Sequence, residues 1–312
     1  MKKLTILFNL FMYSNITLFA DTNTSGKVFY NYSINLDEQR NNAFNMKRAY
    51  LTFANDVSET VSYKVTYDMG GNEGGSVHTA FLKVAMVKWN NSLGDVSIGM
   101  QGLNMFKTME NTWGHRFVQK MPMDTYGFSS SADLGIGLTR GFGAILTSVL
   151  VTNGGGYKNA ESDSHKKFSF HAVFGEPRLN KNDGFNAGAS FSVEPYDIDS
   201  TTTANTNVMG IFAGYGGLGF RGGLEFDTKQ QNDITSQIIC VYGTYKISDK
   251  LSLLARLDQV EGNISVKEDG AIIVGVHYGL EKGLTVAPTF RMTTLEGGET
   301  ENKIVVNFQF QF

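Results

Sequence analysis

The side chains best suited to catalysis or metal binding in this chain are its histidines, its one cysteine and its serines. The five histidines are His78, His115, His165, His171 and His277. None has the spacing of a metal-binding pair with another histidine or with cysteine, so the sequence predicts no zinc site. Ser169 and His171 share a face of an extended segment but lie about 7 Å apart along it, which leaves a hydrolase as a minor alternative. Cys240, inside an apolar run, is expected to be packed.

Residues 217–222 match the G-x-G-x-x-G pattern of dinucleotide sites. Such a site requires a helix after the glycines, whereas residues 218–227 alternate like a strand. The glycine-rich stretches 70–75 and 154–156 are typical of loop tips, with calcium binding through Glu73 or Asp163 as a minor alternative. The net charge of −3 argues against nucleic-acid binding. We therefore expect no enzyme activity, no metal and no cofactor.

Alternation of apolar and polar residues dominates the chain. Residues 61–68 read VSYKVTYD, with valines and tyrosines on one face and polar side chains on the other. Residues 303–312 do the same, and 35 glycines against 4 prolines fit extended segments joined by many turns. About sixteen such segments follow residue 27, and short turns alternate with longer polar breaks between them. The pattern predicts an all-β fold, an antiparallel β-barrel of about sixteen strands.

A bilayer explains this pattern better than water does. Every backbone polar group in a membrane must be satisfied internally, which closed barrels achieve. Tilted strands of about 9–11 residues are long enough to span it, with apolar side chains outward and polar ones toward a wet lumen. A soluble β-sandwich also alternates, but the aromatic richness of the apolar faces favours a transmembrane barrel.

Both ends of the chain indicate export to an outer membrane. Residues 1–20 begin with Lys2 and Lys3, continue through an apolar stretch and end at Ala20, as a cleaved signal peptide does. The barrel then occupies residues 21–312. Phe308, Phe310 and Phe312 end the last strand and look like the C-terminal assembly signal of bacterial outer-membrane barrels. The expected location is a Gram-negative outer membrane, with lipid and the barrel-assembly machinery as partners.

The longest polar break, residues 104–128, is the third on its side of the barrel. Loops of this length are usually functional, and its aromatic residues give it something to pack. We expect it to fold into the lumen and form a constriction, with an external cap or a subunit contact as the alternative. The charged or titratable residues it would bring there are Lys107, Glu110, His115, Arg116, Lys120 and Asp124. Opposite charges facing each other there would create a transverse field.

Several short segments resemble the phosphate-selective porin O and P family. They are RAYLTF at 48–53, VTYD at 65–68, ENTWGHRF at 110–117, SSADLG at 130–135 and VTNG at 151–154. The resemblance runs in scattered motifs from residue 27 to residue 312. It implies a sixteen-strand, usually trimeric, water-filled channel, with ladders of Arg and Lys leading into the pore in the members that bind phosphate.

Charged side chains of both signs fall on the faces assigned to the lumen wall. They are Arg48, Lys64, Asp68, Lys83, Asp95, Asp133, Arg221, Glu225, Asp227, Arg256, Asp258, Arg291 and Lys303. Rings of one sign bias ion passage, and the sequence shows none. The expected function is therefore passive diffusion of small hydrophilic solutes, with an anion- or phosphate-selective porin and a non-conducting surface adhesin as alternatives. Lys83 and Lys88 are an odd number of residues apart, so on a regular strand their side chains would point to opposite faces. One of them is therefore wrongly assigned to the lumen, lies at the membrane interface or lies beyond a bulge.

Overall fold

The computed structural model describes residues 22–37, 42–70, 78–161, 163–262 and 268–312. The expected signal peptide and its cleavage after Ala20 lie outside the described residues. The described part of the chain forms sixteen strands. They are β1 Asn23–Asn35, β2 Asn42–Asp56, β3 Val61–Gly70, β4 Thr79–Asn91, β5 Gly94–Gly102, β6 Ala132–Phe142, β7 Ile145–Thr152, β8 Lys167–Gly175, β9 Gly184–Asp197, β10 Thr203–Gly217, β11 Phe220–Gln231, β12 Ile234–Lys246, β13 Leu251–Glu261, β14 Glu268–Glu281, β15 Leu284–Leu295 and β16 Thr300–Gln311.

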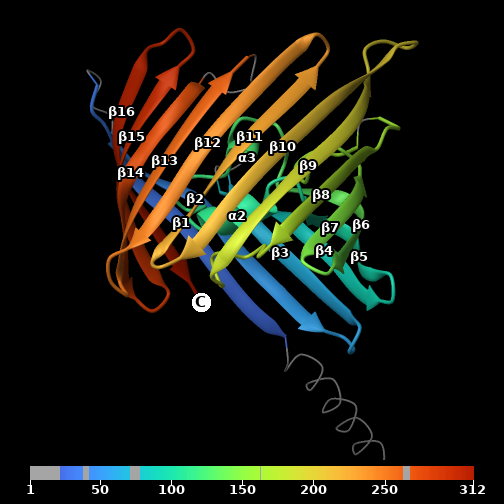
Figure 1. Ribbon diagram of the computed structural model, residues 1–312, viewed down its shortest axis with the longest axis horizontal. Coiled ribbons are helices and arrows are strands. Elements are labelled where there is room, and N and C mark those ends of the chain that lie inside the picture. The colour runs from blue at the N-terminus through green and yellow to red at the C-terminus, as the bar shows by residue number, and fades with distance from the viewer. Residues whose placement is uncertain (1–21, 38–41, 71–77, 162, 263–267) are drawn as a thin grey trace, which may run out of the picture.

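Each strand pairs antiparallel with its neighbours in sequence, and β16 pairs with β1 to close the sheet (Figure 1). In this closing pair Lys27 lies opposite Gln311 and Asn35 lies opposite Lys303. The amide of Gly26 donates to the carbonyl of Phe312 at 3.0 Å, and the amide of Phe312 donates to the carbonyl of Gly26 at 3.1 Å. Closure leaves no open sheet edge. The prediction of an antiparallel barrel of about sixteen strands is confirmed.

Side-chain burial alternates along the strands as expected. On β13, Arg256 and Asp258 are each 2% exposed, whereas Leu253 and Leu257 are each 46% exposed. An apolar outer face and a polar inner face are what a barrel needs when lipid surrounds it and its lumen is wet. No helix in the described part of the chain has the length and hydropathy needed to cross a membrane.

The β-bulges in β4 and β2 each bring an additional lysine to the inner face. In β4 the pairing with β3 shifts between Thr66 and Tyr67, which makes Lys83 the extra residue. The shift allows both Lys83 and Lys88 to lie on the inner side, so the bulge explains their opposite parity. In β2 the pairing with β1 shifts between Phe29 and Tyr30, opposite Arg48 and Met46, and Lys47 is the extra residue.

Among the longer polar breaks, the sequence predicts one at residues 228–233, but these residues are mostly strand. β11 continues to Gln231, and β12 begins at Ile234 after a two-residue turn. Asn232 in this turn has φ +54°, a conformation that asparagine tolerates and that tight hairpin turns require. The glycine motif at 217–222 falls on another such turn, between β10 and β11, and a strand follows it as expected.

Candidate pore constriction

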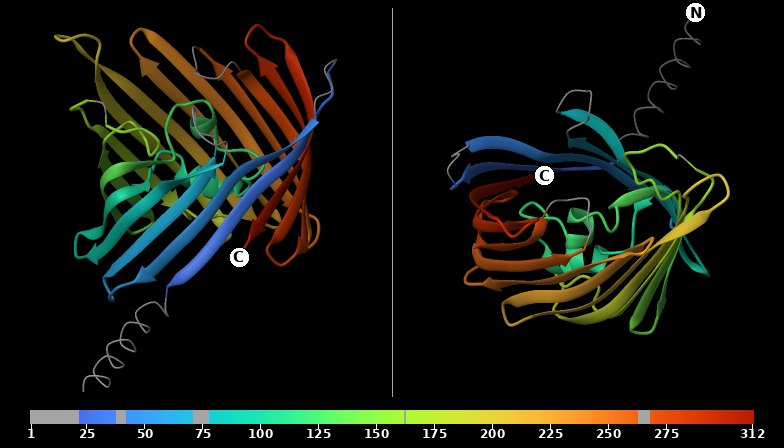
Figure 2. Two further views of the ribbon diagram at one scale, coloured as in Figure 1. Left: turned by 180° about the vertical axis from the view of Figure 1, so that it is seen from behind. Right: turned by 90° about the horizontal axis from the view of Figure 1, so that it is seen from above.

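The connection between β5 and β6, residues 103–131, lies inside the ring of strands and is called the inner loop here (Figure 2). It contains two short helices, α2 Lys107–Trp113 and α3 Pro122–Thr125. Gly114 ends α2 with φ +70°, and Pro122 starts α3 at the position where its missing amide costs nothing. The loop is packed: its buried apolar side chains are Leu103, Met105, Phe106, Met109, Trp113, Phe117, Met121, Met123, Tyr126 and Phe128.

Hydrogen bonds from β8, β9 and β12 attach the inner loop to one side of the barrel. His171 Nε2 lies 2.9 Å from the hydroxyl of Thr108, and His171 Nδ1 lies 2.8 Å from the hydroxyl of Ser190. Ser190 in turn donates to the carbonyl of Met105 at 2.6 Å. His171 therefore bonds Ser190 and the loop, and no hydrogen bond joins it to Ser169, the partner considered for a hydrolase.

Several acidic residues assigned to the lumen wall lie behind this loop. Arg256 donates two hydrogen bonds of 2.8 Å to Asp258, and the hydroxyl of Tyr126 approaches Asp258 at 3.3 Å. The ring of Trp113 lies 5.7 Å from the guanidinium of Arg256. Glu225 is 1% exposed beside them. These carboxylates face inward, but the loop separates them from the open part of the lumen.

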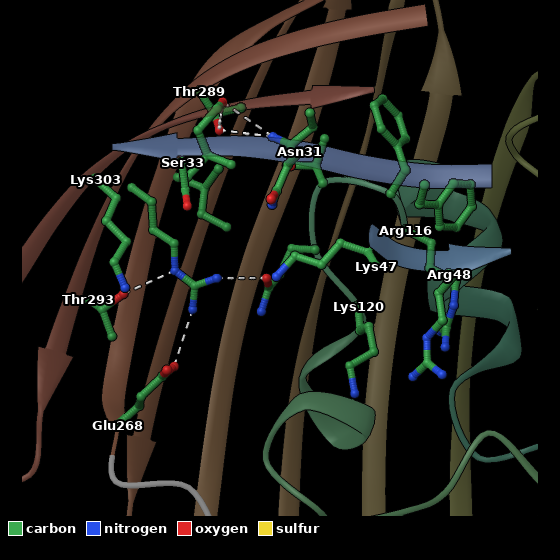
Figure 3. Close-up of a pocket in the computed structure, with 18 of the residues that line it drawn as sticks. Asn31, Ser33, Lys47, Arg48, Arg116, Lys120, Glu268, Thr289, Thr293 and Lys303 are labelled. Atoms are coloured by element: carbon green, nitrogen blue, oxygen red, sulfur yellow. Dashed lines mark hydrogen bonds and ion pairs between the residues drawn. The ribbon is translucent and has the colours of Figure 1, made fainter. Parts of the chain in front are cut away.

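The open part of the lumen holds a cavity of about 360 Å³, called the eyelet cavity, between the inner loop and the opposite wall (Figure 3). Residues 116–120 of the loop form one side, and β1, β2 and β14–β16 form the other. Six cationic side chains line it: Lys47, Arg48, Arg116, Lys120, Arg291 and Lys303. Two acidic side chains, Glu268 and Glu301, also line it. Cations therefore dominate its surface.

On the loop side, a network of ion pairs fixes the cations. Arg116 pairs with Glu110 and, at 2.8 Å, with Asp124, and Lys120 pairs with Asp124 at 3.0 Å. Burial raises the pKa of Glu110, but the charges of Lys107 and Arg116 outweigh it and lower that pKa to about 2. The same balance, with burial outweighed by Arg116 and Lys120, lowers the pKa of Asp124. These groups are charged at neutral pH.

On the wall side, Arg291 reaches across to the loop. Its guanidinium donates to Gln119 at 2.8 Å and to Glu268 at 3.2 Å. Lys303 pairs with Glu301 at 2.5 Å. Lys47, which the bulge in β2 adds to the inner face, has no ion-pair partner among the described residues.

Two further cavities of about 450 Å³ each flank the eyelet cavity. One of them, called the loop-end cavity, lies toward the end of the barrel at which β5 ends and β6 begins. It is lined by Lys158, Lys167 and Lys229 among others, and Lys167 pairs with Glu194 at 2.8 Å. The cavity on the side of the chain termini, the terminus-end cavity, is lined by Lys181, Arg221, Lys246 and one acid, Asp183. Cationic side chains are thus present along the whole lumen.

The residues expected at the constriction are brought together only in part. Arg116 and Lys120 line the eyelet cavity, Asp124 lines the loop-end cavity, and His115 lines the terminus-end cavity. Glu110 supports Arg116 from behind, and the side chain of Lys107 is 62% exposed beside Glu110.

The residues expected on the lumen wall also divide. Arg48, Arg291 and Lys303 line the eyelet cavity, Arg221 lines the terminus-end cavity, and Lys64 lines a smaller recess. Asp68 is fully buried between Arg48 (3.0 Å) and Lys83 (3.5 Å). Asp95 pairs with Lys88, while Asp133 accepts the amides of Leu134 and Gly154. Sequence reasoning missed Lys47, Gln119, Glu268 and Glu301; Glu301 alone carried a signal, since it shares parity with Lys303.

No protein-family model and no curated protein matches the chain. Solved structures do. A Salmonella typhi OmpF complex with daunomycin is 13% identical, with a TM-score of 0.73 over 93% of this chain and 97% of that one. The fold is that of outer-membrane porins. The outer membrane channel DcaP of Acinetobacter baumannii is 13% identical, with a TM-score of 0.68 over 94% and 97%. A mutant of Rh. blastica porin is 12% identical, with a TM-score of 0.64 over 93% and 100%. At such identity the likeness establishes this porin fold and nothing finer.

Proposed function

We propose that the protein is a porin, a water-filled channel for passive diffusion of small hydrophilic solutes across the outer membrane of a Gram-negative bacterium. The apolar outer face, the polar inner face and the three successive cavities along the lumen support this function. The arrangement needs no cofactor and catalyses no reaction. Residues 1–20 act as the export signal, the terminal phenylalanines address the assembly machinery, and the barrel functions as a homotrimer in the lipid.

We further propose that the channel favours anions. The observation that carries this is the eyelet cavity, which six cationic and two acidic side chains line. Rings of Arg and Lys favour anion passage, and the acids that balanced them in the sequence, such as Glu225 and Asp258, lie behind the inner loop. The cations of the lumen, together with the resemblance to phosphate-selective porins, place inorganic phosphate among the solutes to be tested.

Single-channel recording tests both proposals. The mature protein is inserted into a planar bilayer under a KCl gradient. The applied potential at which the net current is zero, the reversal potential, gives the charge preference. We expect stepwise conductance with a reversal potential that indicates a preference for chloride over potassium. The preference for the anion should remain when phosphate replaces chloride. A folded barrel that carries no current contradicts the channel function and favours a surface adhesin. Conductance with a reversal potential at zero or on the potassium side contradicts the anion preference alone.

A further inference from the structure

Two phenylalanine rings meet at the eyelet cavity. Phe29 of β1 and Phe117 of the inner loop have ring centroids 6.2 Å apart, with an angle of 49° between their planes. Both rings are nearly buried, at 5% and 6% exposure, and both line the eyelet cavity. They contribute apolar surface to the cavity from the wall side and from the loop side.

Each of these rings has an arginine next to it, in the strand pairing or in the sequence. Arg48 is the direct partner of Phe29 in the pairing of β2 with β1. Arg116 precedes Phe117 in the inner loop, and both arginines line the same cavity as the rings. The wall and the loop therefore each contribute one aromatic ring and one arginine to the lining of the cavity.

Aromatic contacts continue from this pair toward both ends of the lumen. Toward the loop end, Tyr50 lies 5.6 Å from Phe29, and the ammonium group of Lys83 lies 4.9 Å from the ring of Tyr50 and 5.0 Å from that of Tyr157. Toward the terminus end, Phe117 lies 6.0 Å from His115 and 6.3 Å from His277. Both histidines line the terminus-end cavity with Arg221. Aromatic side chains thus follow the path of the cationic ones.

A hydrated inorganic ion gains nothing from such rings, and apolar walls at a narrow point disfavour water. A flat apolar ring gains offset or edge contacts with phenylalanine, while a carboxylate gains paired hydrogen bonds from a guanidinium group. We propose that the preferred solutes of the eyelet cavity are organic anions with a flat apolar ring, of which aromatic carboxylates are the simplest. This inference rests on the proposed channel function and names the class of solute that the channel selects.

Block of the KCl current by added organic acids tests this inference. Benzoate, cyclohexanecarboxylate and acetate compare a flat ring, a puckered ring of similar size and no ring at the same charge. We expect benzoate to interrupt the single-channel current at concentrations about tenfold lower than acetate, as about 1.4 kcal/mol of additional binding implies. Cyclohexanecarboxylate should fall between them.

Two substitutions separate a solute-binding role of the rings from a packing role. Phe117→Leu and Phe29→Leu each retain an apolar side chain against the neighbours but remove the aromatic face. Each should reduce the advantage of benzoate over acetate several-fold. Phe191→Leu is the matched control, because Phe191 is 39% exposed on the outer face of the barrel. Heat-modifiable migration on gels checks that each variant is folded.

The outcomes distinguish this inference from the proposed function. Absence of any KCl current in the native protein contradicts the channel itself. A normal current that benzoate and acetate block equally contradicts the aromatic-anion inference alone. Stronger block by benzoate that survives both leucine substitutions also overturns it, because the rings would then not be the groups that recognise the solute.

Discussion

Arg291 of β15 donates a hydrogen bond to Gln119 of the inner loop, with 2.8 Å between Nη1 and Oε1. The same guanidinium holds Glu268 at 3.2 Å and the hydroxyl of Thr293 at 3.0 Å. His171, Ser190 and Tyr242 attach the loop to β8, β9 and β12. Arg291 therefore links the loop to the wall across from these anchors.

We expect Arg291→Ala to increase single-channel conductance. The substitution removes a large side chain from the eyelet cavity and a charged hydrogen bond that contributes about 1 kcal/mol or more to loop attachment. It should also weaken the anion preference, because Glu268 loses its partner. Arg140→Ala is the control, since Arg140 is exposed and bonds only the carbonyl of Leu93 among the described residues. An unchanged conductance in Arg291→Ala would contradict the role of Arg291 at the constriction.

The charge balance of the lumen depends on two cations of the loop, Arg116 and Lys120. We expect the double variant Arg116→Gln/Lys120→Gln to shift the reversal potential in a KCl gradient toward potassium, because Asp124 then loses both ion-pair partners and Glu110 keeps only Lys107. Lys120→Gln alone should shift it less, in the same direction.

Lys166→Gln is the control for these variants, because Lys166 pairs with Glu161 and lines none of the three lumen cavities. If the double variant has the reversal potential of the native channel, the inner loop does not filter ions.

The barrel itself was predictable because alternation is a local property. The parity of Arg256 and Asp258 against Leu253 and Leu257 follows directly from the period of a strand, and the structure agrees. The same parity could not reveal that the inner loop covers Asp258. That covering depends on contacts such as that of Tyr126, 132 residues away in sequence. From the sequence alone, the buried carboxylate of Asp258 was therefore assigned to the charges of the lumen wall.

Lys47 was not predictable for a different reason. It has the wrong parity to share a face with Arg48, and only the shift in pairing between β1 and β2 brings both inward. A bulge depends on the register of two paired strands, and no residue type at 46–48 indicates that one is present. The sequence indicated a balance of positive and negative charges in the lumen, whereas the cavity is rich in cations. The covering of Asp258 by the inner loop and the addition of Lys47 by the bulge together account for the difference.

His171 anchors the inner loop to β8 through its hydrogen bond to Thr108. We expect His171→Leu, which keeps much of the volume but loses the bonds to Thr108 and Ser190, to weaken attachment of the loop by about 1–3 kcal/mol. Trypsin added to the folded protein should then cut faster after Lys107, Arg116 or Lys120. The backbone pairing of the sixteen strands does not depend on this side chain, so the barrel should stay folded.

Phe170→Leu, on the outer face of the same strand, controls for the general effect of altering β8. Equal cleavage rates in His171→Leu and Phe170→Leu would show that the hydrogen bonds of His171 do not hold the loop.

Acidification should weaken the inner loop through two groups that lose their contributions over different pH ranges. His115 is 4% exposed, and its Nδ1 donates to the carbonyl of Trp113 at 2.8 Å. Burial lowers the pKa of His115 to about 3, with Arg221 and His277 adding to the effect. Because this pKa lies below the ordinary value of about 6.5, the contribution of neutral His115 is complete above pH 6.5 and is lost as pH falls toward 3. The pKa of Glu110, about 2, places its loss lower, between about pH 4.5 and 2.

The melting temperature of the native protein should therefore decline from pH 6.5 to 4.5, before Glu110 begins to lose its contribution. In His115→Gln, the glutamine amide can still donate to the carbonyl of Trp113 but does not titrate. The melting temperature of this variant should therefore change little between pH 6.5 and 4.5. His165→Gln is the control, since His165 lies with Asp197 at the loop end, away from the three cavities. An equal decline in the native protein and His115→Gln would assign the acid sensitivity to other groups, whereas a flat curve for His115→Gln would identify His115 as the group through which mild acid loosens the constriction.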